Sequence, residues 1–91
     1  MAKLKEFREK IGLSQTQLAE EMCISVRTLQ AYEQGKRDLT GAKLDTILKA
    51  CVILKCSLED LFADDDDLLK LLENYKKQQW FYLLLFYLFN Y

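Results

Sequence analysis

Ninety-one residues with no proline and only three glycines favour one compact helical domain and one additional element. The formal net charge is −1, so bulk charge alone does not indicate nucleic-acid binding. The chain has no histidine, no glycine-rich phosphate loop and no paired-carboxylate motif, so we expect neither an enzyme nor a bound cofactor or small-molecule ligand.

The three cysteines, Cys23, Cys51 and Cys56, are odd in number and contain no C-x-x-C pair. Without histidine they do not form a typical zinc site, so we expect no metal and interpret them as buried, small apolar residues in a reducing compartment. The first residues, MAKLKE, contain no apolar stretch of signal-peptide length. The sequence therefore predicts a cytoplasmic protein.

The first predicted helix covers residues 3–11 and stops at Gly12, because glycine readily adopts the left-handed conformation that ends a helix. Its apolar residues recur at helical spacing: Leu4, Phe7 and Ile11. Ser14 caps a second predicted helix over residues 15–22.

Ser25 caps a third predicted helix, residues 26–34, which ends at Gly35. Thr40 is expected to cap a fourth, residues 41–54. The fourth helix has one apolar face, formed by Leu44, Ile47, Leu48 and Cys51.

Ser57 and Asp60 form a predicted capping box that opens a fifth helix, residues 58–62. Five short helices in about sixty residues, with little turn chemistry for a sheet, predict an all-α fold.

Residues 15–34, QTQLAEEMCISVRTLQAYEQ, have the pattern of two helices that cross at a tight turn. Ala19 is small enough to permit close approach, and Ile24 is placed to fill the turn. The expected packing residues come from both helices: Leu18, Met22, Leu29 and Tyr32.

The segments LSQTQLAEEM, ISVRTLQAYEQGKR and CSLEDLF resemble the helix-turn-helix domain of Cro, the phage repressors and many small bacterial regulators. The resemblance implies a five-helix repressor-like domain over residues 1–63 that binds double-stranded DNA as a transcriptional regulator. It also implies that the third helix enters the major groove, that the second lies across it, and that a dimer reads paired half-sites.

The resemblance assigns DNA contacts position by position. Val26, Arg27 and Gln30 are expected to face base edges, since arginine can pair with guanine and valine can contact a thymine methyl group. Arg27 is the strongest candidate for base readout. The remaining expected contacts are to the backbone or lie beside the reading residues: Gln15, Thr16, Ser25, Thr28, Gln34, Lys36 and Arg37.

The resemblance also implies a buried ion pair between Arg8 of the first helix and Glu33 of the third. Two positions depart from the family pattern, and one of them, Leu39, stands where proline is common. Cys23 occupies a turn position that is usually glycine, and a residue with a Cβ costs about 1 kcal/mol there if φ is positive.

Charge distribution leaves a second interpretation open. Residues 1–62 carry ten Lys and Arg against nine Asp and Glu, so DNA binding requires the cations to gather on one face. The alternative is a protein-interaction module of the same fold, such as an antitoxin, an anti-repressor or an accessory subunit, with weak DNA affinity.

Residues 64–91 begin with four aspartates, which suit the positive N-terminal end of a helix. Leu68, Leu71, Leu72 and Tyr75 mark one apolar face of a helix, and every residue from Trp80 to Phe89 is apolar or aromatic. We expect a dimerisation helix that uses Leu68, Leu72, Tyr75, Trp80 and Leu84.

Other readings of this segment remain open. Ten apolar residues span only about 15 Å of a hydrocarbon core about 30 Å thick, so no membrane span is expected. The segment would lack the basic face that surface insertion usually requires. It could instead fold back on its own domain or form a poorly ordered end.

Overall fold

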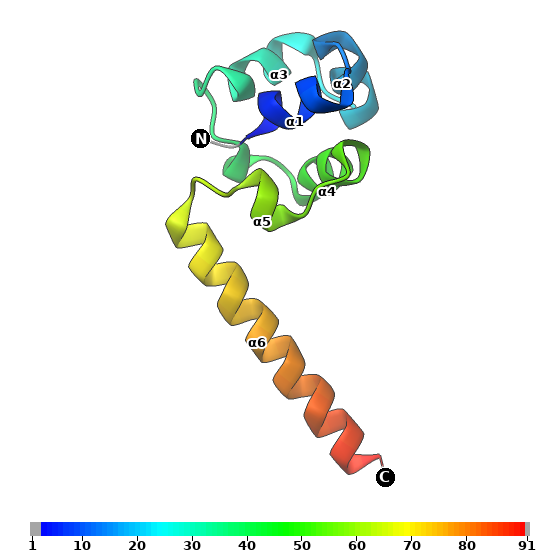
Figure 1. The fold of residues 1–91 in the computed structure, drawn as a ribbon, viewed down its shortest axis with the longest axis vertical. Coiled ribbons are helices and arrows are strands. Elements are labelled where there is room, and N and C mark those ends of the chain that lie inside the picture. Colours follow the sequence, from blue (N-terminus) through cyan, green and yellow to red (C-terminus); the bar gives the residue numbers. More distant parts are fainter. Residues whose placement is uncertain (1–2, 91) are drawn as a thin grey trace.

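The computed structural model describes residues 3–90; Met1, Ala2 and Tyr91, which complete the predicted segments 1–63 and 64–91, lie outside the described residues. The described part is helical and contains no strand (Figure 1), which confirms the predicted all-α fold. Its elements are, in order, α1 (Leu4–Ile11), α2 (Gln15–Met22), α3 (Val26–Glu33), a 3-10 turn (Leu39–Gly41), α4 (Leu44–Leu54), α5 (Leu58–Leu61) and α6 (Asp66–Phe89).

Serine side chains begin three of these helices, as the sequence predicts. Ser14 Oγ accepts a hydrogen bond from the Gln17 N–H at 3.1 Å, and the Gln17 side-chain oxygen accepts one from the Ser14 N–H at 2.9 Å. Ser25 caps α3, and Ser57 forms a second capping box at α5. These caps satisfy backbone N–H groups that have no partner inside the helix.

The predicted start of the fourth helix, with Thr40 as its cap, is wrong. Asp38 instead caps the 3-10 turn by accepting a hydrogen bond from the Thr40 backbone N–H at 3.0 Å. The turn places Leu39, 2% exposed, in the core, and the chain is extended before α4 begins at Leu44. The need to bury Leu39 therefore delays the helix.

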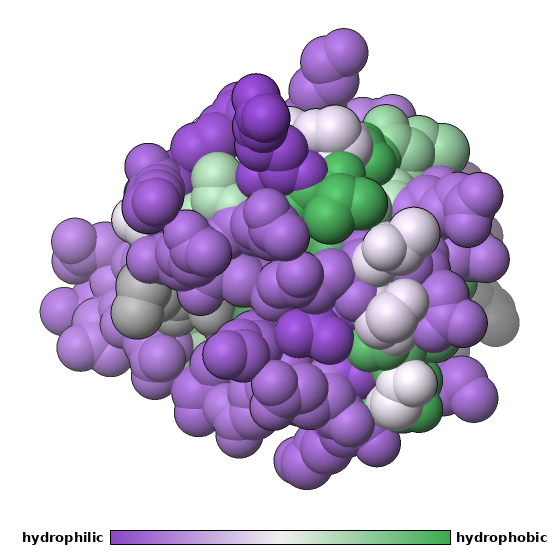
Figure 2. Space-filling model, turned by 90° about the horizontal axis from the view of Figure 1, so that it is seen from above, coloured by the Kyte–Doolittle hydropathy of each residue, from purple (hydrophilic) through white to green (hydrophobic). Residues whose placement is uncertain are grey.

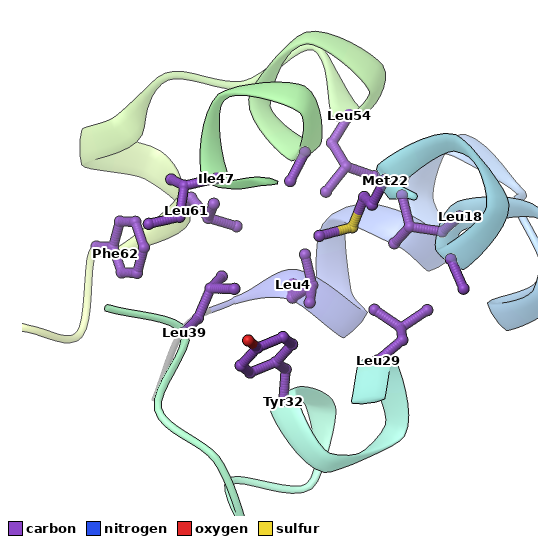
Figure 3. Packing of buried hydrophobic residues seen from close by; sticks show 12 residues of the cluster. Leu4, Leu18, Met22, Leu29, Tyr32, Leu39, Ile47, Leu54, Leu61 and Phe62 are labelled. Atoms are coloured by element: carbon purple, nitrogen blue, oxygen red, sulfur yellow. The ribbon is translucent and has the colours of Figure 1, made fainter. Parts of the chain in front are cut away.

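The core lies between the first five helices, whose apolar side chains point toward a common centre (Figure 3). Small Ala19 and Ala50, at most 1% exposed, let the backbones approach closely. The core consists of Leu4, Leu18, Ala19, Met22, Leu29, Tyr32, Leu39, Ile47, Ala50, Leu54, Leu61 and Phe62.

The buried face of α4 differs from the predicted one. Ile47 is buried and Cys51 packs against the core as predicted, but Leu44 and Leu48 are 68% and 44% exposed. The helix instead turns Ala50 inward. Packing of this small residue decides which side of an apolar helix is buried.

Cys23 is exposed, which corrects the prediction that all three cysteines are buried. It ends α2 in the left-handed conformation, with φ 59°, so the turn adopts a conformation that favours glycine although it has none. Cys51 and Cys56 are half-buried, and burial raises the pKa of both thiols, that of Cys56 to about 11. Both therefore remain protonated at neutral pH and are poor nucleophiles.

α6 extends away from the other helices instead of folding back over them (Figure 1). Asp65 caps it by accepting a hydrogen bond from the Leu68 N–H at 3.1 Å, and the Leu68 side chain packs against the core. The fold-back reading is therefore wrong. No helix within residues 3–90 combines the length and apolar content needed to cross a membrane.

An ion pair between Lys76 of α6 and Glu59 of α5 also joins the two parts of the molecule. The hydrogen bond from Lys76 lowers the pKa of the Glu59 carboxyl group. The contact is therefore retained above the ordinary titration range of glutamate and lost as the pH falls through the lowered pKa. Because Lys76 is largely exposed, its contribution to stability is small.

Arg8 and Glu33 form the ion pair that links α1 to the end of α3. Arg8 Nε donates to Glu33 Oε2 at 2.7 Å and Nη2 donates to Oε1 at 3.2 Å, a two-point contact. Arg8 Nη1 also donates to the Leu13 carbonyl at 2.9 Å. The side chains are only 10% and 2% exposed, so each charge depends on the other for compensation. The hydrogen bonds to Glu33 raise the pKa of Arg8.

We predict that Cys23→Gly increases the free energy of unfolding by about 0.5–1 kcal/mol, because glycine adopts a positive φ without the clash of a Cβ atom. Cys23→Ala is the matched control: it removes the thiol but keeps the Cβ, so it should not stabilise the protein. Urea denaturation measures both, and equal stability of the two variants would contradict the presence of strain at this turn.

We predict that Arg8→Ala lowers the free energy of unfolding by about 3–5 kcal/mol, because it leaves the Glu33 carboxylate buried and unpaired. Lys5→Ala, at an exposed position of the same helix, should change it by less than about 0.5 kcal/mol. Thermal and urea unfolding compare the two variants. A loss for Arg8→Ala no greater than that for Lys5→Ala would show that the pair contributes nothing.

Candidate nucleic-acid interface

α2 and α3 form a crossing pair at the end of the molecule opposite the tip of α6 (Figure 1). The turn between them is closed by hydrogen bonds from the N–H groups of Cys23 and Ile24 to the carbonyls of Glu20 and Ala19, at 3.1 and 3.0 Å. Ile24 packs against the core, as the sequence predicts. The pair therefore has a defined crossing geometry.

The molecular surface seen from this end is largely hydrophilic, with small apolar areas between the polar side chains (Figure 2). A polar surface of this kind suits a groove lined by base edges and phosphates, where hydrogen bonds carry most contacts. Packing of α2 and α3 on the core leaves their outer faces free for such contacts.

The first turn of α3 presents Arg27 to solvent. Ser25 holds this turn in place by accepting a hydrogen bond from the Thr28 N–H at 3.0 Å, and the two hydroxyl groups lie 2.8 Å apart. Val26 is half-buried and packs against the core, so only part of its side chain is available to a thymine methyl group. Arg27 is therefore the better placed of the two predicted reading residues.

A chain of hydrogen bonds connects the two helices to the buried ion pair. Gln15 Nε2 donates to Glu33 Oε1 at 2.9 Å, and Gln30 Nε2 donates to Gln15 Oε1 at 3.2 Å. The arrangement runs from Arg8 through Glu33 and Gln15 to Gln30. These hydrogen bonds hold Gln15 and Gln30, two of the predicted DNA-contacting residues, side by side and restrict the orientation of their amide groups.

The Gln30 amide keeps hydrogen-bonding capacity for a ligand. Among the hydrogen bonds of residues 3–90, its side chain makes the single one to Gln15, which uses one of two N–H groups. Its other N–H and its carbonyl oxygen match the pair of groups that adenine presents in the major groove.

Four of the five residues predicted to contact the DNA backbone are exposed, all except the half-buried Gln15: Thr16, Gln34, Lys36 and Arg37. Thr16 lies in the first turn of α2, where backbone N–H groups and the helix dipole favour an anion. The N–H groups of Lys36 and Arg37 both donate to the Ala31 carbonyl, at 2.9 and 3.1 Å, which folds the segment back against α3. The Arg37 guanidinium carbon lies 5.3 Å from the centre of the Tyr32 ring.

Sequence reasoning missed two positioning contacts at this surface. Glu33 holds Gln15 as well as Arg8, and Tyr32 stacks beneath Arg37. Neither contact has a signal in the residue spacing, because each depends on how the helices cross. Within the described residues, no three His, Cys, Asp or Glu side chains gather in a way that could hold a metal ion.

Comparison with known proteins agrees with this geometry. Residues 4–61, well over half of the chain, match the family model described as helix-turn-helix, and this range covers α1 to α5. A comparison with curated proteins gave no match. The crossing pair, its polar outer face and the extent of the match lead to one assignment: the chain belongs to the helix-turn-helix family of Cro and the phage repressors, a family of DNA-binding regulators.

Proposed function

We propose that this protein is a sequence-specific transcriptional regulator and not an enzyme, with α3 in the major groove of double-stranded DNA and α2 across the groove. The observation that carries the proposal is the exposed Arg27 on the first turn of α3, beside a Gln30 side chain held by Gln15. This function requires the protein to be in the cytoplasm with the DNA.

The proposed contacts divide into two kinds. Arg27 and Gln30 read bases, because their side chains can form paired hydrogen bonds with guanine and adenine respectively. Val26, Ser25 and Thr28 lie beside them at the start of α3. Five other residues set the register through the DNA backbone: Gln15, Thr16, Gln34, Lys36 and Arg37.

The small positive charge of the domain limits the affinity. With ten cations against nine anions in residues 1–62, binding depends on the few cations near α3, so it should be modest and strongly sensitive to salt.

The same charge balance favours the second candidate, a protein-interaction module such as an antitoxin or accessory subunit. Retention on heparin or random DNA that falls steeply with salt would support the first candidate, and no retention at low salt the second.

We further propose that α6 joins two copies of the chain. Because α6 leaves the domain on the side opposite α2 and α3, parallel pairing about a two-fold axis turns both α3 helices toward the same DNA (Figure 1). The two α3 helices would then lie about 34 Å apart, one turn of the duplex. The first three turns of α6 offer Leu68, Leu72 and Tyr75 on one side for this contact.

We predict that Arg27→Ala and Lys36→Ala differ in kind. Arg27→Ala should lose about 1–3 kcal/mol of binding to the operator, with little loss on random DNA. Lys36→Ala should weaken both alike and lower the slope of log K against log salt by about one. The operator is first found by footprinting the DNA upstream of the gene for this protein. Equal losses on operator and random DNA for Arg27→Ala would remove it from base readout.

We predict that Tyr75→Lys in the full chain weakens binding to a palindromic operator at least tenfold, because it places a charge in the proposed interface, and leaves binding to a single half-site unchanged. Asn74→Lys adds the same charge about 100° round the helix and is the matched control. Gel shifts on both DNAs measure the effect. Unchanged palindrome binding by Tyr75→Lys would contradict parallel pairing through this face.

A further inference from the structure

The distal segment of α6, Trp80 to Phe89, is apolar in every direction. Successive residues of an α-helix are about 100° apart, so ten consecutive apolar residues cover the whole circumference. The structure leaves nearly all of them open: nine of the ten side chains here are 55–83% exposed, all except Leu85. A helix that is apolar all round is normally buried all round.

The apolar surface of α6 also changes direction along the helix. Leu68, Leu72 and Tyr75 lie within about 60° of one another, whereas Trp80 and Leu84 lie roughly 120–160° round from Leu68. Two straight helices that meet through the first face therefore turn Trp80 and Leu84 away from their contact. The five residues expected to form one interface belong to two.

The exposed apolar area of the distal segment is also consistent with a second interface, separate from the one near Tyr75. Its six aromatic residues are on average about two-thirds exposed, and each aromatic side chain can bury about 150–250 Å², so together they offer roughly 600–1,000 Å². A stable interface needs about 800 Å² from each partner. A single neighbouring helix covers only one side of the segment, roughly half of this area, so at least two further helices are required.

We propose that the distal segments of four copies cluster, so that two of the α6-paired dimers of the proposed function join into a tetramer. This inference rests on that proposed dimer. Because soluble oligomers normally have closed symmetry, two joined dimers make four chains the smallest complete assembly. Charge sets the arrangement: dimers that meet tip to tip keep the aspartate runs at residues 64–67 at opposite ends, whereas a parallel cluster brings all four runs together. The four DNA-binding domains then lie in two pairs at the two ends.

Two other binding partners fit the distal segment less well. A lipid surface is disfavoured because residues 63–91 carry five acids against three lysines, and anionic headgroups repel such a segment. The exposed α4 stripe of another copy, Leu44, Leu48 and Val52, would cover only one side of the segment. The experiment below distinguishes both of these partners from the tetramer.

The test measures the mass of the full chain by sedimentation equilibrium from 1 to 100 μM, together with acrylamide quenching of Trp80, the single tryptophan. We expect four times 10.7 kDa and a protected Trp80. Leu84→Lys should halve the mass and expose Trp80 to quenching, while palindromic DNA is still bound. Val52→Lys, on the exposed α4 stripe, is the matched control and should leave the tetramer intact.

The remaining outcomes separate the tetramer from the dimer. A wild-type dimer whose mass Leu84→Lys does not change overturns the cluster and leaves the dimer standing, whereas a wild-type monomer overturns both. A monomeric Leu84→Lys variant supports the cluster but contradicts pairing through Tyr75. Loss of the tetramer in Val52→Lys would show that the distal segment docks on α4 of another copy. Flotation of a monomer with phosphatidylglycerol vesicles would show that the segment binds lipid. Either result overturns the proposal.

Discussion

The buried ion pair between Arg8 and Glu33 is the constraint on which the proposed DNA-binding surface depends. Two charges that are at most 10% exposed are stable only while they satisfy one another, so α1 and α3 are held at one separation and one rotation. Glu33 Oε1 also accepts from Gln15, which extends the same constraint to the start of α2. Three helices thus meet at one carboxylate, and the Gln30 amide at the outer surface takes its position from that buried group.

This rigidity matters because the domain has little net charge. A strongly basic protein can bind DNA through phosphate neutralisation before any side chain finds its base. Here the domain carries only one more cation than anions, so recognition must rely on the placement of a few side chains. The serine cap of α3, the Gln15–Gln30 hydrogen bond and the stacking of Arg37 on Tyr32 all restrict side chains before DNA is present. Such restriction reduces the entropy that binding would otherwise cost.

In the proposed function, α6 separates DNA recognition from assembly of the copies. The helix points away from α2 and α3, and its contacts with the domain include the Leu68 side chain at its start and the Lys76–Glu59 ion pair (Figure 1). Its apolar surface changes from one face near Tyr75 to the whole circumference beyond Trp80. A single helix therefore carries two surfaces of different geometry, one suited to a pair of helices and one to a larger cluster.

The sequence by itself determined the features that act within one or two helical turns. Ser14, Ser25 and Ser57 set helix starts because each cap bonds a backbone N–H only three residues away. The positions of Leu18, Ala19, Met22 and Leu29 identified the crossing pair because their spacing repeats with the helix. Tertiary structure decided the rest: burial of Leu39 delayed α4, packing of Ala50 left Leu44 and Leu48 exposed, and the helix crossing brought Gln15 to Glu33. Tertiary structure also decided the direction of α6. Which face of a helix is covered depends on residues that are distant in sequence, and a local sequence pattern does not contain their arrangement.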